Sequence, residues 1–105
     1  MQSRSLAWVG RLRSGNRPGM TVAAEYHQKE ILGRYSANDH AVARAAGYKH
    51  PRDYQAYLTR HIGEHGIINP PQWTTSDKTL SEGYHRYAAM RQLGRRTMPV
   101  RKIHG

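Results

Sequence analysis

Apolar residues recur at helical spacing in the middle of the chain. Tyr54, Leu58 and Ile62 lie four residues apart, which places them on one face of a helix and predicts a core stripe. The predicted helix covers residues 52–64, and Pro51 fits its first turn because proline lacks an amide hydrogen that would need a partner there. This segment is therefore expected to pack against the rest of the domain.

Two shorter helices are predicted before this one, over residues 22–32 and 40–46. Thr21 is the expected N-cap of the first helix, and Asn38 or Asp39 is the expected N-cap of the second. Short polar side chains are favoured at such positions because they accept hydrogen bonds from first-turn amides. Each helix is followed by a glycine, which is a common stop signal.

Short strands are predicted at both ends of the chain. The first covers residues 6–12, and the last three cover residues 72–75, 79–81 and 98–103. A helix over residues 83–93 lies between the last two strands, and we expect it to bury Ala88, Ala89 and Leu93. This order predicts one α/β domain over residues 1–105, with a small mixed sheet and surrounding helices.

The start of that last helix carries the candidate chemistry. Its sequence is Glu82-Gly83-Tyr84-His85-Arg86, and a glycine lets the backbone turn sharply into the helix. First-turn amides have no partner within a helix and lie at the positive end of its dipole. Because His85 and Arg86 add side-chain donors, the segment predicts a site for phosphate or another anion.

Charge strengthens this interpretation. The net charge is +10, and the excess lies at the two ends of the chain, since residues 21–81 hold seven basic and six acidic side chains. A basic surplus of this kind favours a polyanionic partner, of which nucleic acid is the most common. The candidate phosphate contacts after the turn are Arg91, Arg95, Arg96, Arg101 and Lys102.

Composition excludes several classes of protein. The chain has no cysteine, so a disulfide scaffold, a thiolate metal site and a cysteine nucleophile are excluded. No apolar run approaches the length of a membrane span, and the apolar run near the start is too short for a secretory signal. We therefore expect a cytoplasmic protein without membrane partners.

The C-terminal half resembles the ParB/sulfiredoxin-like superfamily, which includes ParB-like nuclease domains. The resemblance rests on Gly66-Ile67-Ile68-Asn69-Pro70, the Glu-Gly-Tyr-His-Arg turn, Leu93-Gly94 and Met98-Pro99-Val100, in that order. It implies a domain core over residues 52–103, with residues 21–50 as a helical insertion or replacement. It also implies that Gly83, Tyr84, His85 and Arg86 bind nucleotide or nucleic-acid phosphate. Small standalone proteins of this type occur in bacteriophages and other mobile elements, which implies that source and a bacterial host cell.

The chain departs from the family at one position. Where sulfiredoxins have the catalytic cysteine and partition proteins have a glutamate, this chain has Tyr84. Tyrosine offers neither a thiolate nor a carboxylate, so sulfiredoxin chemistry is excluded and the partition-type nucleotide switch is placed in doubt. Glu82 is then the one acid near the turn that an enzymatic mechanism can use, as a base or a magnesium ligand.

Two other patterns are explained by structure rather than by chemistry. His61-Ile62-Gly63-Glu64-His65 has the spacing of an inverted zinc-protease motif. Gly63 weakens the helix and no third ligand stands out, so we predict no metal site. Trp73 and Tyr87 have rings that can stack on a base, but we expect Trp73 to pack beneath the hairpin.

The sequence supports three hypotheses of function. The first is a protein that grips DNA backbone at the glycine turn and the basic ends, with weak sequence preference. The second is a kinase, nucleotide hydrolase or nuclease that uses Glu82, with a nucleoside triphosphate and magnesium as its cofactor. The third is a phage protein that binds and inhibits a host protein. The residues at the turn favour binding over catalysis, and the oligomeric state stays open.

Overall fold

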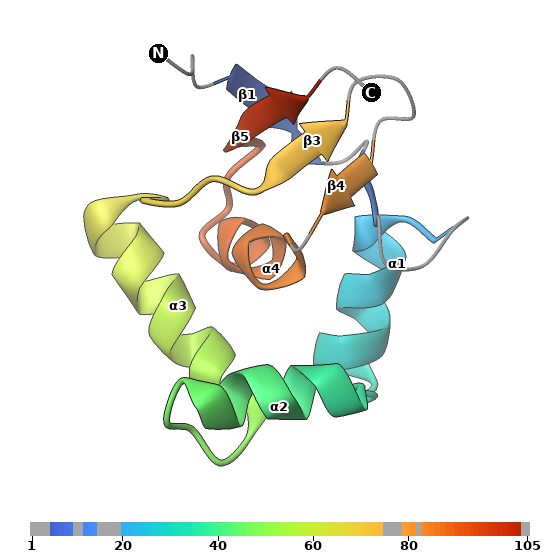
Figure 1. The fold of residues 1–105 in the computed structure, drawn as a ribbon, viewed down its shortest axis with the longest axis vertical. Coiled ribbons are helices and arrows are strands. Elements are labelled where there is room, and N and C mark those ends of the chain that lie inside the picture. The colour runs from blue at the N-terminus through green and yellow to red at the C-terminus, as the bar shows by residue number, and fades with distance from the viewer. Residues whose placement is uncertain (1–4, 10–11, 15–19, 75–78, 82, 104–105) are drawn as a thin grey trace.

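The structure of the protein is a computed structural model, which describes residues 5–9, 12–14, 20–74, 79–81 and 83–103. It is a small mixed α/β domain, as the order of predicted elements indicated (Figure 1). Within these ranges, no helix combines the length and apolar character needed to cross a membrane.

The strands form one mixed sheet in the order β1-β5-β3-β4-β2. β1 is antiparallel to β5, β5 is parallel to β3, and β3 is antiparallel to β4. The predicted hairpin is confirmed in its two strands, while its turn lies outside the described residues. The bounds are Ser5–Trp8 for β1, Arg13–Ser14 for β2, Gln72–Thr74 for β3, Thr79–Ser81 for β4 and Thr97–Ile103 for β5.

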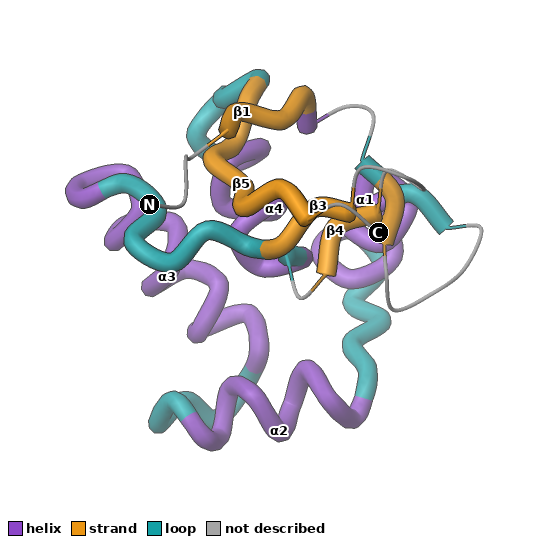
Figure 2. Tube along the Cα trace, turned by 45° about the horizontal axis from the view of Figure 1, so that its top comes forward, coloured by secondary structure: helices purple, strands orange, loops and turns teal. Residues whose placement is uncertain are grey.

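The helices lie on one side of this sheet. In Figure 1, α4 (Tyr84–Gln92) lies beneath the strands, and the other helices surround it on the side away from them. Figure 2 shows the same separation, with the strands in front of α4. The surrounding helices are α1 (Val22–Tyr26), α2 (Ala37–Ala45) and α3 (Pro51–His65).

The core lies between the sheet and α4. Tyr87, Ala88 and Ala89 of this helix are fully buried, as are Met98 and Val100 of β5. The predicted burial of the two alanines is confirmed, and Leu93 is partly buried against the same core. α4 is therefore enclosed on several sides, and its first turn is fixed in position by the packing of the turns that follow.

The predicted helix over residues 22–32 is regular only in its first half. After α1 the chain continues as a π-helical turn, η2 (His27–Ile31), in which the Leu32 amide donates to the His27 carbonyl oxygen five residues back. π-Helical turns are rare in proteins, and many of those that occur lie at functional sites. Here the wider turn is where the neighbours Lys29 and Glu30 both contact Tyr84 of α4.

The predicted N-cap of α2 is wrong. The helix begins three residues earlier than expected, and Ser36 is its cap. The Ser36 hydroxyl accepts from the Asp39 amide at 3.1 Å, and the Asp39 carboxylate accepts from the Ser36 amide at 2.8 Å. This capping box satisfies two amides at once. Asp39 thus lies inside the first turn, where its carboxylate is also available to neighbouring elements.

The predicted core stripe on α3 is only partly correct. Ile62 is buried in the core, whereas Tyr54 and Leu58 are half-buried. α3 begins beside α2 and runs from there towards the sheet (Figure 1), so its first turns lie at the α2 end of the molecule, away from the sheet. The two side chains therefore line a pocket that the helices enclose.

The reason for glycine at position 83 also differs from the expectation. Gly83 has φ −103° and ψ 4°, which other residues adopt, so the turn does not need the conformational freedom of glycine. A Cβ atom built on Gly83 would lie 2.6 Å from Leu80 Cγ, and Leu80 is 2% exposed. Close packing against the strand before the turn, rather than backbone conformation, thus explains the glycine.

Replacing Gly83 with alanine is expected to lower the free energy of unfolding by about 1–3 kcal/mol, the usual cost of overpacking a core. Urea unfolding followed by circular dichroism measures this change. Gly63→Ala is the matched control, because a Cβ atom there would meet only the Leu93 side chain, at 3.2 Å from Cδ2. The control is expected to stay within about 1 kcal/mol of the wild type. Equal effects of the two substitutions would contradict the packing explanation.

Candidate ligand pocket at the start of α4

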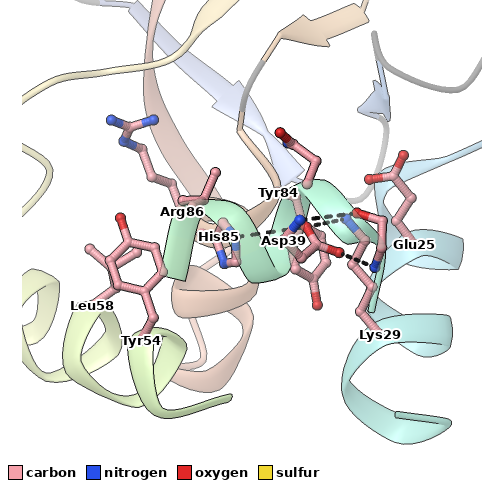
Figure 3. A pocket seen from close by; sticks show the side chains of 11 residues that line it. Glu25, Lys29, Asp39, Tyr54, Leu58, Tyr84, His85 and Arg86 are labelled. Carbon is pink, nitrogen blue, oxygen red and sulfur yellow. Dashed lines mark hydrogen bonds and ion pairs between the residues drawn. The ribbon is translucent and has the colours of Figure 1, made fainter. Parts of the chain in front are cut away.

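The predicted glycine turn leads into a pocket of about 690 Å³. The first turn of α4 forms its back wall, α3 lies on one side, α1 and η2 lie on the other, and α2 lies in front (Figure 3). Helices from residues 21–50 therefore supply two of the walls. The sequence had left the role of this segment open. The lining residues are Glu25, Lys29, Ser36, Asn38, Asp39, Val42, Tyr54, Leu58, Tyr84, His85 and Arg86.

A buried ion pair joins two of these walls. Lys29 Nζ lies 3.0 Å from Asp39 Oδ1, and the two residues are 7% and 4% exposed. Burial raises the pKa of Asp39, but the hydrogen bond from the Ser36 amide and the contact with Lys29 outweigh it, so the pKa is lowered overall. Asp39 is therefore ionised at neutral pH, and its charge is balanced by Lys29.

Tyr84, which the predicted resemblance aligns with a catalytic position, is a packing residue in this structure. It is 7% exposed, Lys29 Nζ lies 4.2 Å from its ring centroid, and its hydroxyl donates to Glu30 Oε1 at 3.3 Å. Burial, followed by the charge of Glu30, raises the pKa of Tyr84. The phenol thus stays neutral and anchors η2 to α4.

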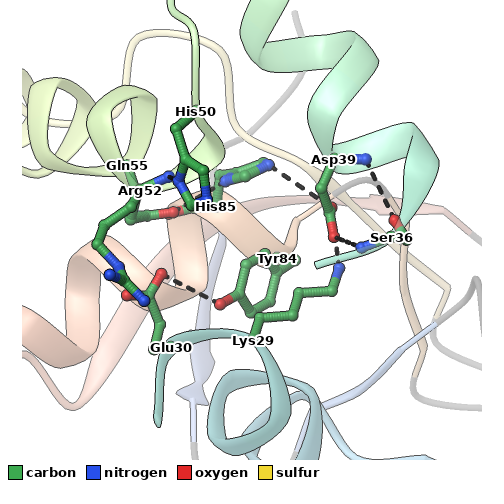
Figure 4. Close-up of polar contacts among 9 residues, drawn as sticks. All are labelled: Lys29, Glu30, Ser36, Asp39, His50, Arg52, Gln55, Tyr84 and His85. Atoms are coloured by element: carbon green, nitrogen blue, oxygen red, sulfur yellow. Dashed lines mark hydrogen bonds and ion pairs between the residues drawn. The ribbon is translucent and has the colours of Figure 1, made fainter. Parts of the chain in front are cut away.

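Gln55 fixes the orientation and the tautomer of His85 (Figure 4). Gln55 Nε2 donates to the His85 carbonyl oxygen at 2.8 Å, so the amide oxygen must face the ring. That oxygen lies 2.9 Å from His85 Nδ1, and because it can only accept, Nδ1 carries the proton. The other ring nitrogen, Nε2, then has a free lone pair and lies 3.9 Å from Asp39 Oδ1.

The surroundings keep His85 neutral. The pKa of His85 is lowered to about 4, mainly by burial; the charge of Asp39 raises it, and the charges of Lys29 and Arg86 lower it. The rings of Tyr54 and Tyr84 each lie 5.2 Å from the imidazole. A neutral imidazole contributes no positive charge, so an anion bound at this turn would depend on Arg86 and on the helix amides.

The start of α4 retains the features of an anion site. Its N-cap is Gly83, which has no side chain to accept hydrogen bonds from the first-turn amides. The first main-chain bond of the helix runs from the Tyr87 amide to the Gly83 carbonyl oxygen at 2.8 Å. Arg86 is half-buried and lines the pocket. Glu82, the candidate base, lies outside the described residues.

The other predicted phosphate contacts lie outside this pocket. Arg91 stacks over the Tyr26 ring at 5.4 Å, and Lys102 lies over the Trp73 ring at 5.6 Å. Arg101 Nε donates to the Pro70 carbonyl oxygen at 3.1 Å. Arg95 and Arg96 are exposed in the connection between α4 and β5. The structure therefore separates Arg86 from these five residues, since Arg91 lies in the last turn of α4 and the other four follow the helix.

The structure also places two other sequence patterns. Trp73 is partly buried against the core, with Lys102 over its ring, and Tyr87 is fully buried, so the Tyr87 ring cannot stack on a base. The rings of His61 and His65 lie 4.8 Å apart on the outer part of α3. Among the described residues, no group of three or more histidine or acidic side chains is placed to hold a metal ion.

Sequence reasoning missed Lys29 and Gln55 and assigned Asp39 only to a helix cap. Lys29 and Asp39 are ten residues apart, and Gln55 is thirty residues from His85, so no local spacing links them. The one available signal was Gln55 itself, a polar side chain beside the predicted core stripe. It is 1% exposed, and a buried amide needs partners.

Comparison with known proteins adds no further assignment. No family model matches the chain, and neither the curated proteins nor the solved structures contain a match. The resemblance to the ParB/sulfiredoxin-like superfamily therefore stays a prediction, as does inhibition of a host protein.

Proposed function

We propose that the protein binds the phosphate backbone of nucleic acid through the first turn of α4 and the arginines beyond its other end. The observation that carries this proposal is the position of Arg86 beside a helix start whose N-cap is glycine, at the rim of a pocket. Helix starts of this kind favour anions because the first amides and the helix dipole act together. Arg86 adds a permanent positive charge.

Nucleic acid is favoured over a small anion by the spread of charge. α4 has nine residues and is therefore about 13.5 Å long at about 1.5 Å per residue. A DNA strand advances about 3.4 Å per phosphate, so about four phosphates cover the distance from Arg86 to Arg95 and Arg96. The protein carries a net charge of +10, which attracts a polyanion over a longer range.

The finer fold assignment belongs to the same proposal. The hairpin β3–β4, the glycine turn, α4 and β5 follow in the order that the ParB/sulfiredoxin-like motif requires. A mixed sheet with helices on one side supports it as well. The helices of residues 21–50 would then be an addition that closes the phosphate site into a pocket.

Alanine at Arg95 and Arg96 is expected to weaken binding to a generic DNA duplex and to flatten its salt dependence. Each lost phosphate contact lowers the slope of log K against log salt by about 0.9. Fluorescence anisotropy at several salt concentrations measures this, with Arg86→Ala as a third variant. Arg44→Ala/Arg60→Ala is the matched control, because it removes the same charge from exposed positions on α2 and α3.

The control is expected to keep the wild-type slope. If both double variants lose affinity equally, only net charge matters, and the proposed backbone track is wrong. If the wild type does not bind the duplex at low salt, the proposal of nucleic-acid binding fails altogether.

Binding of a free nucleotide in the pocket is the second candidate function. The pocket volume of about 690 Å³ favours it, since pockets for cofactors and drug-sized ligands span roughly 300–1,000 Å³. Tyr54 and Leu58 offer an apolar wall on α3, opposite the polar groups of α2 and η2 (Figure 3). A base can pack against the first wall while Arg86 meets the phosphate.

A further inference from the structure

Two hydrogen-bond acceptors face each other in the pocket. His85 Nε2 carries a lone pair, because the proton of the ring is on Nδ1 and is donated to Gln55. Asp39 Oδ1 is ionised, and the two atoms lie 3.9 Å apart. Neither atom has a proton to give, and 3.9 Å is longer than a hydrogen bond. Asp39 Oδ1 already accepts from Lys29 Nζ at 3.0 Å, whereas no hydrogen bond to His85 Nε2 is seen in the part of the chain that the structure describes.

A single donor atom can serve both acceptors. An atom placed about 2.8 Å from each of two atoms 3.9 Å apart subtends about 90° between them, within reach of a group with two hydrogens. A primary amino group supplies the two hydrogens, whereas a carbonyl oxygen would present a third acceptor. Asp39 Oδ2 accepts from the Ser36 amide, and Oδ1 accepts from Lys29 Nζ at 3.0 Å, so a ligand donor would use the second lone pair of Oδ1.

The charges around this position select a neutral group. Lys29 balances Asp39 at 3.0 Å, and Arg86 adds a positive charge to the same pocket. Two acidic residues, Asp39 and Glu25, and two basic residues, Lys29 and Arg86, line the pocket, so an ammonium ion would find no net negative charge to offset its desolvation. The amino group of a conjugated ring or a carboxamide is uncharged. Such a planar group can also pack against Tyr54 and Leu58.

From these contacts we infer that the pocket binds a planar ligand through a neutral primary amino group, which donates to His85 Nε2 and Asp39 Oδ1. Gln55 is a positioning residue, since it holds the tautomer that leaves Nε2 free to accept. This inference extends the second candidate function, the binding of a free nucleotide in the pocket. Only the contact between Arg86 and a phosphate of the ligand depends on that proposed function. The aminopurine ring of adenosine is a suitable probe, because inosine differs from it by a carbonyl oxygen in place of the amino group.

The test is a titration of the wild-type protein with adenosine, inosine and their 5′-monophosphates by calorimetry. The amino forms are expected to bind about tenfold or more tightly than the inosine forms. The carbonyl oxygen of inosine would face His85 Nε2 and Asp39 Oδ1, and all three atoms are hydrogen-bond acceptors. Equal affinities within each pair overturn the inference, and so does the absence of binding by all four. A preference for adenosine that is unaffected by the phosphate supports the inference and contradicts phosphate binding in this pocket.

Two further measurements keep the result independent of any one variant. Nitrogen-15 NMR of His85 is expected to show the tautomer with the proton on Nδ1, and the opposite tautomer overturns the inference. His85→Phe, which keeps a ring but removes both nitrogens, is expected to abolish the preference for the amino forms. His65→Phe is the matched control, since that side chain is 58% exposed at the far end of α3 and should leave the preference unchanged.

Discussion

Asp39→Ala is expected to destabilise the protein by about 3–5 kcal/mol, the usual cost of removing one partner of a buried ion pair. Lys29 would be left with its charge only 7% exposed and with no carboxylate at 3.0 Å. Part of the loss comes from the capping box, which is worth about 1 kcal/mol. Urea unfolding of the wild type and the variant measures the difference.

Three further variants separate these contributions. Ser36→Ala removes the hydroxyl of the capping box but retains the ion pair, so its cost is expected to be about 1 kcal/mol. Lys29→Met alone leaves the carboxylate of Asp39 without its cation, and Lys29→Met/Asp39→Asn removes both charges. Replacing both charges is often neutral, so the double variant should be more stable than Asp39→Ala. A cost for Asp39→Ala no greater than that of Ser36→Ala would show that the ion pair contributes nothing.

Acidification from pH 7 to about 4 is expected to remove about 3 kcal/mol of stability through His85. Its pKa is about 4 in the folded protein and 6.5 for the unperturbed side chain. Between these values the unfolded state binds a proton that the folded state does not, so stability falls as the pH falls through this window. One unit of pKa corresponds to about 1.4 kcal/mol, which gives the size of the effect.

The measurement is the free energy of unfolding of the wild type minus that of His85→Gln at each pH. This difference is needed because other groups titrate nearby. Burial raises the pKa of Glu30, which gives a slope of the opposite sign above pH 4.5, and the lowered pKa of Asp39 acts only below 3.8. His65→Gln is the control, since it should leave the slope intact. A pH-independent difference for His85→Gln would mean that His85 is not held neutral by its surroundings.

These two predictions concern the same part of the molecule. Asp39, Lys29 and His85 come from three different helical segments and line one pocket, and Gln55 of a fourth segment, α3, contacts His85. The ion pair fixes α2 against η2, and the Gln55 amide fixes α3 against α4. The stability of the helical side of the domain and the geometry of the candidate site therefore depend on the same contacts.

The pattern of the chain predicted most of the elements near the C-terminus. The hairpin strands, α4 and β5 were expected within one or two residues of their observed bounds, because glycines, prolines and turn residues separate them clearly. The burial of Ala88 and Ala89 followed from helical spacing. The two-residue strand β2 was missed, since a pairing of Arg13 and Ser14 with β4 leaves no periodic signal.

Only the part of the candidate site that lies within one stretch of sequence was predicted. Gly83, His85 and Arg86 are neighbours in the sequence, so the turn, the helix start and its charge could be recognised directly. The pocket around them could not, because its other walls come from residues 21–58. The prediction that His85 holds phosphate stays open, but the structure gives this residue a neutral ring with Nε2 as an acceptor.

The sequence by itself determined the α/β class, the basic surplus and the glycine-led helix start with Arg86, because each depends on composition or on residues within one turn of each other. Only the tertiary structure decided the packing role of Tyr84, the reason for glycine at position 83 and the protonation of His85. Those three depend on Glu30, Leu80 and Gln55 respectively, and two of these partners come from distant helices. Burial and hydrogen bonding act through space, so a side chain acquires its chemistry from neighbours that the order of residues does not reveal.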